Sequence, residues 1–130
     1  MDRKLLVVDD DIRILNFVRM GLRIAGYQVI TTTSGEGALR LLESDKPDLV
    51  VLDILMPGMD GIEVLRRLRA VSEVPVVVIS AHISAAAEAL RVGANDFLAK
   101  PFTPNELVKL IQKLLDQKQK QSDCYLPFHV

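Results

Sequence analysis

Reactive polar side chains stand directly after short apolar runs at four places in this sequence. They are Asp9 with Asp10, then Asp53, Ser80 and Lys100, after apolar residues at 5–8, 49–52, 76–79 and 97–99. In an open parallel sheet the strands are buried apolar runs, and ligands gather beyond their carboxyl ends. We therefore expect these side chains to converge on one rim. Three carboxylates, a hydroxyl and a lysine there would bind a divalent cation and accept a phosphoryl group.

The predicted chemistry depends on Asp53. An aspartate carboxylate can attack a phosphoryl group and form an acyl phosphate, provided that the repulsion between the two anions is neutralised. Asp9 and Asp10 would supply further ligands for a magnesium ion, because a right-handed crossover places their strand beside that of Asp53. The backbone carbonyl of Leu55 is the nearest candidate for another ligand. Lys100 would pair with Asp53 before the reaction and with phosphate oxygens after it.

Each of these residues also has an ordinary structural explanation when it is taken alone. Asp10 or Asp11 could cap a helix, and Asp53 could cap a turn. Ser80 could satisfy an amide at the end of a strand, and Lys100 could be a solvated surface charge. Their coincidence at four strand ends favours a common site.

The elements that would position these groups follow an alternating pattern. The predicted strands are Leu5–Asp9, Gln28–Thr32, Asp48–Asp53, Val76–Ser80 and Asn95–Ala99. Segments with helical periodicity separate them up to about Leu115, which is typical of βαβ units in an α/β fold. The first, third and fourth strands lack polar alternation, so both of their faces should be covered.

Five helices are predicted between and after these strands. Their start signals are capping residues, namely Ser34, Asp60 with Glu63, and Thr103 with Glu106. The stop signals of the first, second and fourth helices are Gly26, Lys46-Pro47 and Gly93. The fourth helix, Ser84–Val92, is short and rich in alanine, so we expect it to be marginal. The fifth has Pro104 in its first position and one apolar stripe, and should close the domain against the sheet.

Composition describes an ordinary folded domain. The chain has 130 residues, of which 49% are hydrophobic and 25% charged, and a formal net charge of -1, which gives no electrostatic reason to expect direct binding to nucleic acid or to an anionic membrane. The single Cys124 cannot form an internal disulfide, and the first apolar stretch is too short for a secretory signal or a membrane span. We expect a cytoplasmic protein.

The domain is expected to occupy residues 1–120. Residues 121–130 form a tail without an assigned role, because 117–121 are polar and 124–130 are apolar without periodicity. A disordered end, a surface strap, a linker and a cloning remnant all fit such a segment.

Four motifs together resemble the receiver domain of bacterial two-component response regulators. They are Leu5–Asp11, Val51–Gly61, Ile79–Ala81 and Phe97–Phe102, and the resemblance extends over about residues 4–116. It implies a doubly wound, flavodoxin-like (βα)5 three-layer sandwich with a parallel five-strand sheet of order 2-1-3-4-5. It also implies that the chain is a phosphorylation-dependent signalling switch and not an enzyme. Such a domain catalyses only its own Mg²⁺-dependent phosphorylation and dephosphorylation.

The resemblance implies partners as well. A sensor histidine kinase or phosphotransfer protein would phosphorylate Asp53. The face formed by the fourth helix, fifth strand and fifth helix would then change for a downstream effector domain or protein. A second copy of the chain is a further candidate partner, in a phosphorylation-linked homodimer. Asn95 and Leu110, however, stand where winged-helix regulators carry the aspartate and arginine of their dimer salt bridges. The stretch from Ser80 to Lys100 also looks about two residues shorter than is usual.

Several single-residue roles follow from the same resemblance. Ser80 would donate a hydrogen bond to the phosphoryl group, and Phe97 would swing inward behind it, unless Phe97 is a static core aromatic. The Lys100-Pro101 peptide would be cis. Leu55 and His82 would border the phosphoryl group and tune its hydrolysis, and the ordinary alternative for His82 is an exposed loop histidine. Since an apolar Leu55 cannot orient an attacking water, a long-lived acyl phosphate is expected.

Other function classes remain as alternatives. A pseudo-receiver would bind partners without phosphate, although every reactive side chain is present. A haloacid-dehalogenase-like hydrolase would need an acid where Leu55 stands. A dinucleotide fingerprint would need a third glycine where Arg40 follows Gly35-Glu36-Gly37.

Overall fold

A computed structural model of the chain describes residues 3–56, 58 and 60–125, with residues 118–125 described by their backbone alone. In these ranges strands and helices alternate. The strands are β1 (Lys4–Val8), β2 (Gln28–Thr32), β3 (Leu49–Asp53), β4 (Val76–Ser80) and β5 (Asp96–Ala99). The helices are α1 (Ile12–Ile24), α2 (Gly35–Asp45), α3 (Gly61–Val71), α4 (Ala86–Val92) and α5 (Pro104–Tyr125), with a 3-10 turn, η1 (Ile83–Ala85), before α4.

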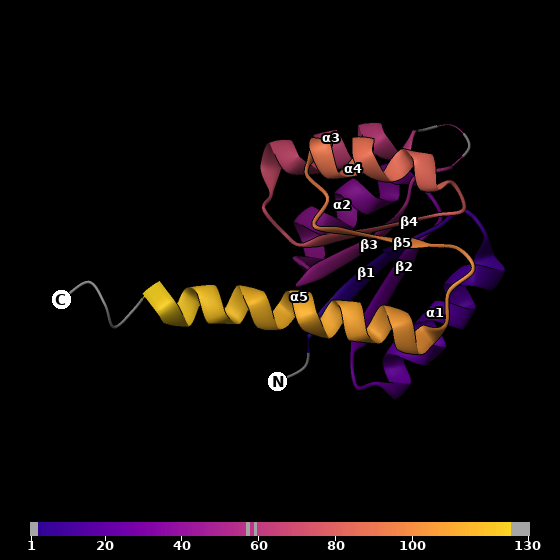
Figure 1. The fold of residues 1–130 in the computed structure, drawn as a ribbon. Coiled ribbons are helices and arrows are strands. Elements are labelled where there is room, and N and C mark those ends of the chain that lie inside the picture. Colours follow the sequence, from indigo (N-terminus) through magenta and orange to yellow (C-terminus); the bar gives the residue numbers. More distant parts are fainter. Residues whose placement is uncertain (1–2, 57, 59, 126–130) are drawn as a thin grey trace.

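The five strands form one parallel sheet of order β2-β1-β3-β4-β5, which confirms the order that the receiver-domain resemblance implied. Helices α2, α3 and α4 cover one face of the sheet, and α1 and α5 cover the other (Figure 1). The register places Val8 opposite both Thr32 and Leu52, and Asp53 opposite Ile79. The carboxyl ends of the strands are therefore level, and the residues that follow them meet at one rim.

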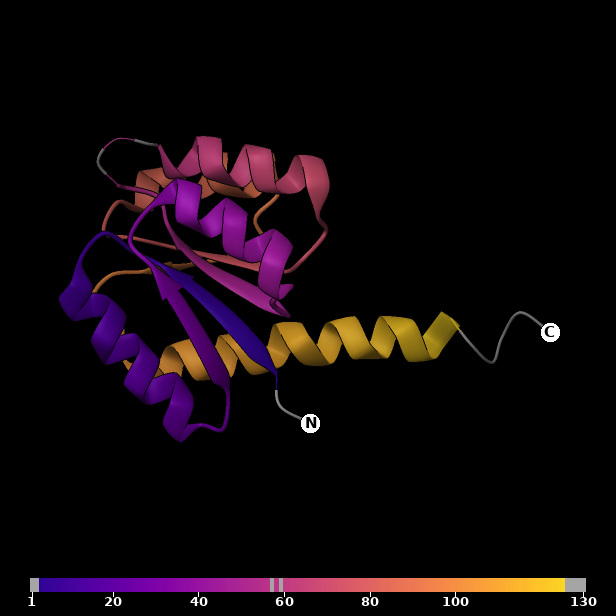
Figure 2. The same ribbon diagram turned by 180° about the vertical axis from the view of Figure 1, so that it is seen from behind.

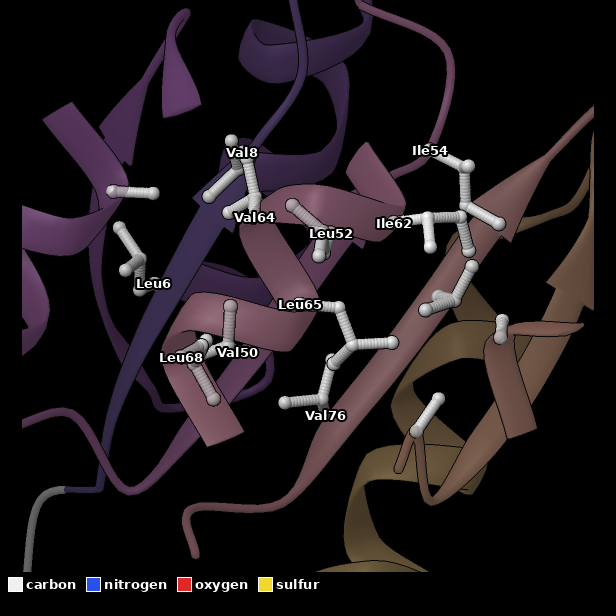
Figure 3. Close-up of a cluster of buried hydrophobic side chains, with 14 of the residues drawn as sticks. Leu6, Val8, Val50, Leu52, Ile54, Ile62, Val64, Leu65, Leu68 and Val76 are labelled. Carbon is white, nitrogen blue, oxygen red and sulfur yellow. The ribbon is translucent and has the colours of Figure 1, made fainter. Parts of the chain in front are cut away.

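The central strands are buried on both faces, which explains their unbroken apolar runs. Every residue of β3 and β4 is buried, whereas β5 at the edge is only half-buried. Alternate strand residues feed two separate cores, one under α2, α3 and α4 and one under α1 and α5. In the first core, Leu65 and Leu68 of α3 lie over Val50, Leu52 and Val76 of the sheet (Figure 3). This packing fixes the face of each strand and so fixes the direction of the side chains at its end.

The predicted caps are present at the helix starts. Ser34, Asp60 and Thr103 each accept a hydrogen bond from a first-turn N–H, at 3.0, 2.9 and 3.2 Å. Glu63 pairs with Arg66 at 2.9 Å within α3. Each cap satisfies an N–H group that has no partner inside its helix.

Two helices differ from the prediction in extent. Only Ala89 is buried in α4, which is short and preceded by the 3-10 turn η1. Helix α5 continues to Tyr125, past the predicted boundary at residue 120, and projects beyond the sheet in both views (Figures 1 and 2). Residues 105–125 contain no glycine or proline to end it. The rest of the predicted tail, residues 126–130, lies outside the described residues. None of the helices described is both long and apolar enough to cross a membrane.

Candidate functional site

Four strand ends supply the side chains of the rim. Asp9 follows β1, Asp53 is the last residue of β3, Ser80 is the last of β4, and Lys100 follows β5. Backbone hydrogen bonds continue past the strands here, because the Asp9 N–H donates to the carbonyl of Thr32 at 3.3 Å and the Lys100 N–H to that of Ser80 at 2.9 Å. The rim residues are thus held by the sheet rather than by a free loop.

Three carboxylates meet at this rim. One carboxylate oxygen from each of Asp9, Asp10 and Asp53 lies within 4.8 Å of those of the other two. Asp9 and Asp53 are buried, while Asp10 is exposed. Hard oxygen donors at one point, open to water on one side, suit Mg²⁺, which keeps several of its waters. The donor set therefore fits the cation that the sequence predicted.

The lysine reaches the same cluster. Nζ of Lys100 lies 3.0 Å from Oδ2 of Asp9 and 3.3 Å from Oδ2 of Asp53. The sequence predicted a pair with Asp53 alone, so the shorter contact with Asp9 is new. The Lys100-Pro101 peptide is cis, as expected.

Burial and charge perturb the ionisable groups of the rim. Burial raises the pKa of Asp53 to about 6, and the charge of Asp9 adds to the rise. Lys100 and the N–H of Leu55 act in the opposite direction on this carboxyl. For Lys100, burial acts to lower the pKa, but the hydrogen bonds and charges of Asp9 and Asp53 raise it overall. The lysine therefore stays protonated, and the metal-free site holds an excess of negative charge that a cation would offset.

Backbone groups around the carboxylates were missed by the sequence reasoning. The Asp11 N–H donates to Oδ1 of Asp9 at 3.0 Å, and the Leu55 N–H donates to Oδ1 of Asp53 at 3.2 Å. Gly61, the first residue of α3, lies against the end of β3. A Cβ there would fall 2.5 Å from the carbonyl oxygen of Ile54, and it would also overlap the Ile54 Cα. The available signal was a glycine directly after the capping residue of α3.

The remaining predicted residues surround this centre without joining the charge cluster. Ser80 is fully buried and its hydroxyl accepts a hydrogen bond from the His82 N–H at 3.0 Å. His82 is exposed, and Leu55 is 52% exposed despite its apolar side chain. Phe97 lies opposite Val78, two residues before the end of β5, and packs half-buried against the core under α4.

The rim thus brings together three carboxylates, which can act as a nucleophile or as cation ligands, and the positive charge of Lys100. Oδ2 of Asp53 is already engaged by Lys100, while the other oxygen accepts from backbone. Such an arrangement can neutralise an incoming phosphoryl anion and direct it to one carboxylate.

Comparisons with known proteins agree with the resemblance. A family model of the response regulator receiver domain matches residues 5–112. Transcriptional regulatory protein PrrA of Mycobacterium tuberculosis is 43% identical over 118 residues, which cover 88% of this chain and 51% of PrrA. The alkaline phosphatase synthesis transcriptional regulatory protein PhoP of Bacillus subtilis is 38% identical over 122 residues, covering 92% and 51%. This chain therefore spans about half the length of these curated relatives.

A solved structure agrees with the fold. The crystal structure of the receiver domain of NtrX from Brucella abortus matches with a TM-score of 0.82 at 36% identity, covering 86% of this chain and 98% of that one. The two chains share the arrangement of the sheet and the helices, and at 36% identity they are also similar in sequence.

Proposed function

This chain belongs to the response regulator receiver domain family, and we propose that it is a phosphorylation-dependent switch in which Asp53 accepts the phosphoryl group. One observation carries the proposal: the carboxylates of Asp9, Asp10 and Asp53 lie within 4.8 Å of one another, and Lys100 bridges two of them. Asp9 and Asp53 are both buried and hydrogen-bonded to Lys100, but of the three carboxylates only Asp53 ends the central strand, β3. Asp53 is also the position at which the receiver-domain resemblance places the acceptor.

The proposed reaction is transfer from a phosphohistidine of a sensor histidine kinase or phosphotransfer protein. An oxygen of Asp53 forms a bond to phosphorus while the P–N bond of the donor breaks, and the electron pair of that bond stays on the donor imidazole. The product is an acyl phosphate on Asp53. Lys100 stabilises the charge that develops on the phosphoryl oxygens, since its ammonium group is already within reach of the nucleophile.

Magnesium would be held by Asp9, Asp10 and Asp53, together with the backbone carbonyl of Leu55. Bound there, the ion would neutralise negative charge on the carboxylates and on the transferred group. The raised pKa of Asp53 supports this assignment, because it reflects a site with too few positive charges for its burial.

The switch is proposed to act through Ser80 and Phe97. If the hydroxyl of Ser80 turns to donate to the phosphoryl group, it leaves the His82 N–H, its present donor. Phe97 is half-buried and packs against the core rather than within it, so it can move into space that Ser80 vacates. The effector contact would then be made by α4, β5 and α5.

The lifetime of the phosphorylated state is proposed to depend on Leu55 and His82. Leu55 offers no polar atom in its side chain to orient an attacking water, which favours slow hydrolysis. A half-life of only seconds for the acyl phosphate would contradict this. Replacement of Leu55 by glutamine should shorten the half-life, measured by loss of phosphorylated mass with time.

The surface of α1 supports docking of the phosphodonor beside the rim. Phe17, Met20 and Ile24 are 55%, 66% and 82% exposed, and they line a hollow of about 430 Å³ between α1 and α5. Residues 12–25 carry three arginines and no acidic residue. An apolar stripe beside positive charge fits an amphipathic helix with acidic residues along its edge. We assign such a helix to the donor protein.

Intact mass after incubation with acetyl phosphate and magnesium tests the acceptor. The wild-type chain should gain one phosphoryl group, and Asp53→Asn should gain none. Asp48→Asn is the matched control, because Asp48 stands just before the other end of the same strand. The assignment is overturned if Asp53→Asn is phosphorylated at the wild-type level, or if EDTA leaves the wild-type gain unchanged.

A further inference from the structure

Arg69, near the end of α3, joins three separate segments at the amino ends of the strands, which lie opposite the rim. Its guanidinium group donates to the carbonyl oxygens of Gly93 at 2.8 Å, Ser72 at 3.2 Å and Val74 at 2.7 Å, and to Oδ1 of Asn95 at 2.8 Å. Four acceptors in a fixed arrangement match the planar fork of an arginine and would not match a lysine. The side chain is half-buried, so these contacts are only partly shared with water.

Of the acceptors of Arg69, Ser72 caps the end of α3 itself, Gly93 ends α4, and Val74 and Asn95 stand just before β4 and β5. Oδ1 of Asn95 also accepts from the Val76 N–H at 2.8 Å, and the Asn95 N–H donates to the Val76 carbonyl at 2.8 Å. Gly93, which ends α4, has a φ of 126° and donates to the carbonyls of Ala89 and Leu90 at 3.1 and 3.2 Å. The positive charge of Arg69 also favours the carbonyl ends of α3 and α4. This end of α4 is thus held by several bonds.

The amino end of α4 lacks comparable bonds in the part of the chain described. No side chain caps η1 or α4, and Ile83 in η1 is 71% exposed. The segment is tied to the rim by the hydrogen bond from the His82 N–H to the hydroxyl of Ser80. One end of α4 is therefore anchored, and the other is connected directly to the phosphoryl site.

We infer that Arg69 is a positioning residue that anchors the carboxyl end of α4, so that phosphorylation at Asp53 moves the amino end of α4 about a pivot at Gly93. The inference rests on the proposed switch through Ser80. When Ser80 turns toward the phosphoryl group, the His82 N–H loses its acceptor and η1 rearranges. The anchor at Arg69 confines this change to residues 80–90 and leaves the starts of β4 and β5 in place.

Hydrogen exchange of backbone amides, with and without beryllofluoride and magnesium as the phosphoryl analogue, tests the anchor. In the wild type, the analogue should change exchange in residues 80–90 and leave residues 93–96 as they were. In Arg69→Gln, exchange of residues 93–96 should rise about tenfold, and the change on activation should extend into them. Arg66→Gln is the matched control, because Arg66 is exposed and its ion pair, with Glu63 at 2.9 Å, lies within α3. It should behave as the wild type.

A second variant should strengthen the anchor instead of weakening it. Asn95→Asp places a carboxylate at the position that accepts from Arg69 and Val76, so exchange of residues 93–96 should slow. This variant decides the question if Arg69→Gln does not fold. The anchor is wrong if Asn95→Asp exchanges like the wild type, or if a folded Arg69→Gln confines the change to residues 80–90.

Two failures remain distinguishable in the same experiment. If the analogue alters no exchange in the wild type, or alters it equally in Asp53→Asn, the proposed switch fails and the anchor fails with it. If the wild type responds and the response does not depend on Arg69 or Asn95, only the anchor fails. Phosphorylation of Arg69→Gln by acetyl phosphate should remain at the wild-type rate. Arg69 lies at the amino ends of the strands, whereas Asp53 lies at the carboxyl end of β3.

Discussion

Replacement of Asp53 by asparagine should stabilise the metal-free protein. Asp53 is only 2% exposed, and Asp9 adds a second negative charge beside it, with Lys100 as the compensating cation. Burial and the charge of Asp9 raise the pKa of Asp53 from 3.8 to about 6, although Lys100 acts to lower it. The difference between these two pKa values corresponds to about 3 kcal/mol against the ionised folded state. Asparagine keeps the shape of the side chain without the charge.

The pH dependence gives the direction of the effect. Between the unfolded pKa near 4 and the folded value of about 6, the folded protein binds more protons at this carboxyl than the unfolded chain does. Wild-type stability should therefore fall as pH rises through this window, and the loss is complete above about pH 7. The gain in Asp53→Asn should accordingly be about 3 kcal/mol at neutral pH and should vanish below about pH 4.

Urea unfolding followed by far-UV circular dichroism, in EDTA and at several pH values, measures this gain. Asp116→Asn serves as control, because Asp116 is an exposed aspartate on α5 and should change stability by no more than about 0.5 kcal/mol. Equal or lower stability of Asp53→Asn at neutral pH would refute the reasoning. A gain that persisted unchanged in acid would show that it has another origin.

Three further changes test other parts of the account. Magnesium at about 100 times its Kd should stabilise the wild type by about 2.7 kcal/mol in thermal unfolding. Asp10→Asn should need more magnesium for the same stabilisation. An unchanged magnesium dependence in that variant would remove Asp10 from the ligand set. Gly61→Ala should lose about 3 kcal/mol in urea unfolding, because its methyl group meets the Ile54 backbone 2.5 Å away, while Gly58→Ala, with open space around its Cβ but a φ of 84°, should lose less. Phe17→Asp should slow phosphotransfer from a donor protein about tenfold and leave phosphorylation by acetyl phosphate unchanged; equal slowing with both donors would show that α1 acts on the site rather than on docking.

The sheet and the rim were predictable because they follow from local patterns. The strands Gln28–Thr32 and Val76–Ser80 were predicted to the residue, since both segments are rich in β-branched residues. Parallel pairing then forces the residues after each run onto the same edge, whatever the details of the helices. The meeting of Asp9, Asp10 and Asp53 needed no more information than this.

The features that were not predicted depend on distances between distant segments. No local pattern shows that Lys100 lies nearer to Asp9 than to Asp53, because this depends on the path of β5 and the following peptide. Arg69 reads as a surface arginine in an amphipathic helix, and its acceptors lie up to 26 residues away. The end of α5 was also missed, because residues 117–121 are polar and suggest a tail, although they are good helix formers.

At the charge cluster, the free energy of cation binding also stabilises the folded state. Two buried carboxylates and one exposed carboxylate share one ammonium group among the described residues, so these residues carry uncompensated repulsion in the metal-free fold. A cation that relieves this repulsion binds the folded state alone, because the unfolded chain does not hold the three residues together. Asp10 can serve such binding at little cost to folding, since it is exposed. Asp9 is buried and lies 3.0 Å from Lys100, so loss of the lysine would leave Asp9 without this ion pair. We therefore expect Lys100 to stabilise the resting state as well as the proposed phosphoryl transfer, because it contacts both buried carboxylates rather than Asp53 alone.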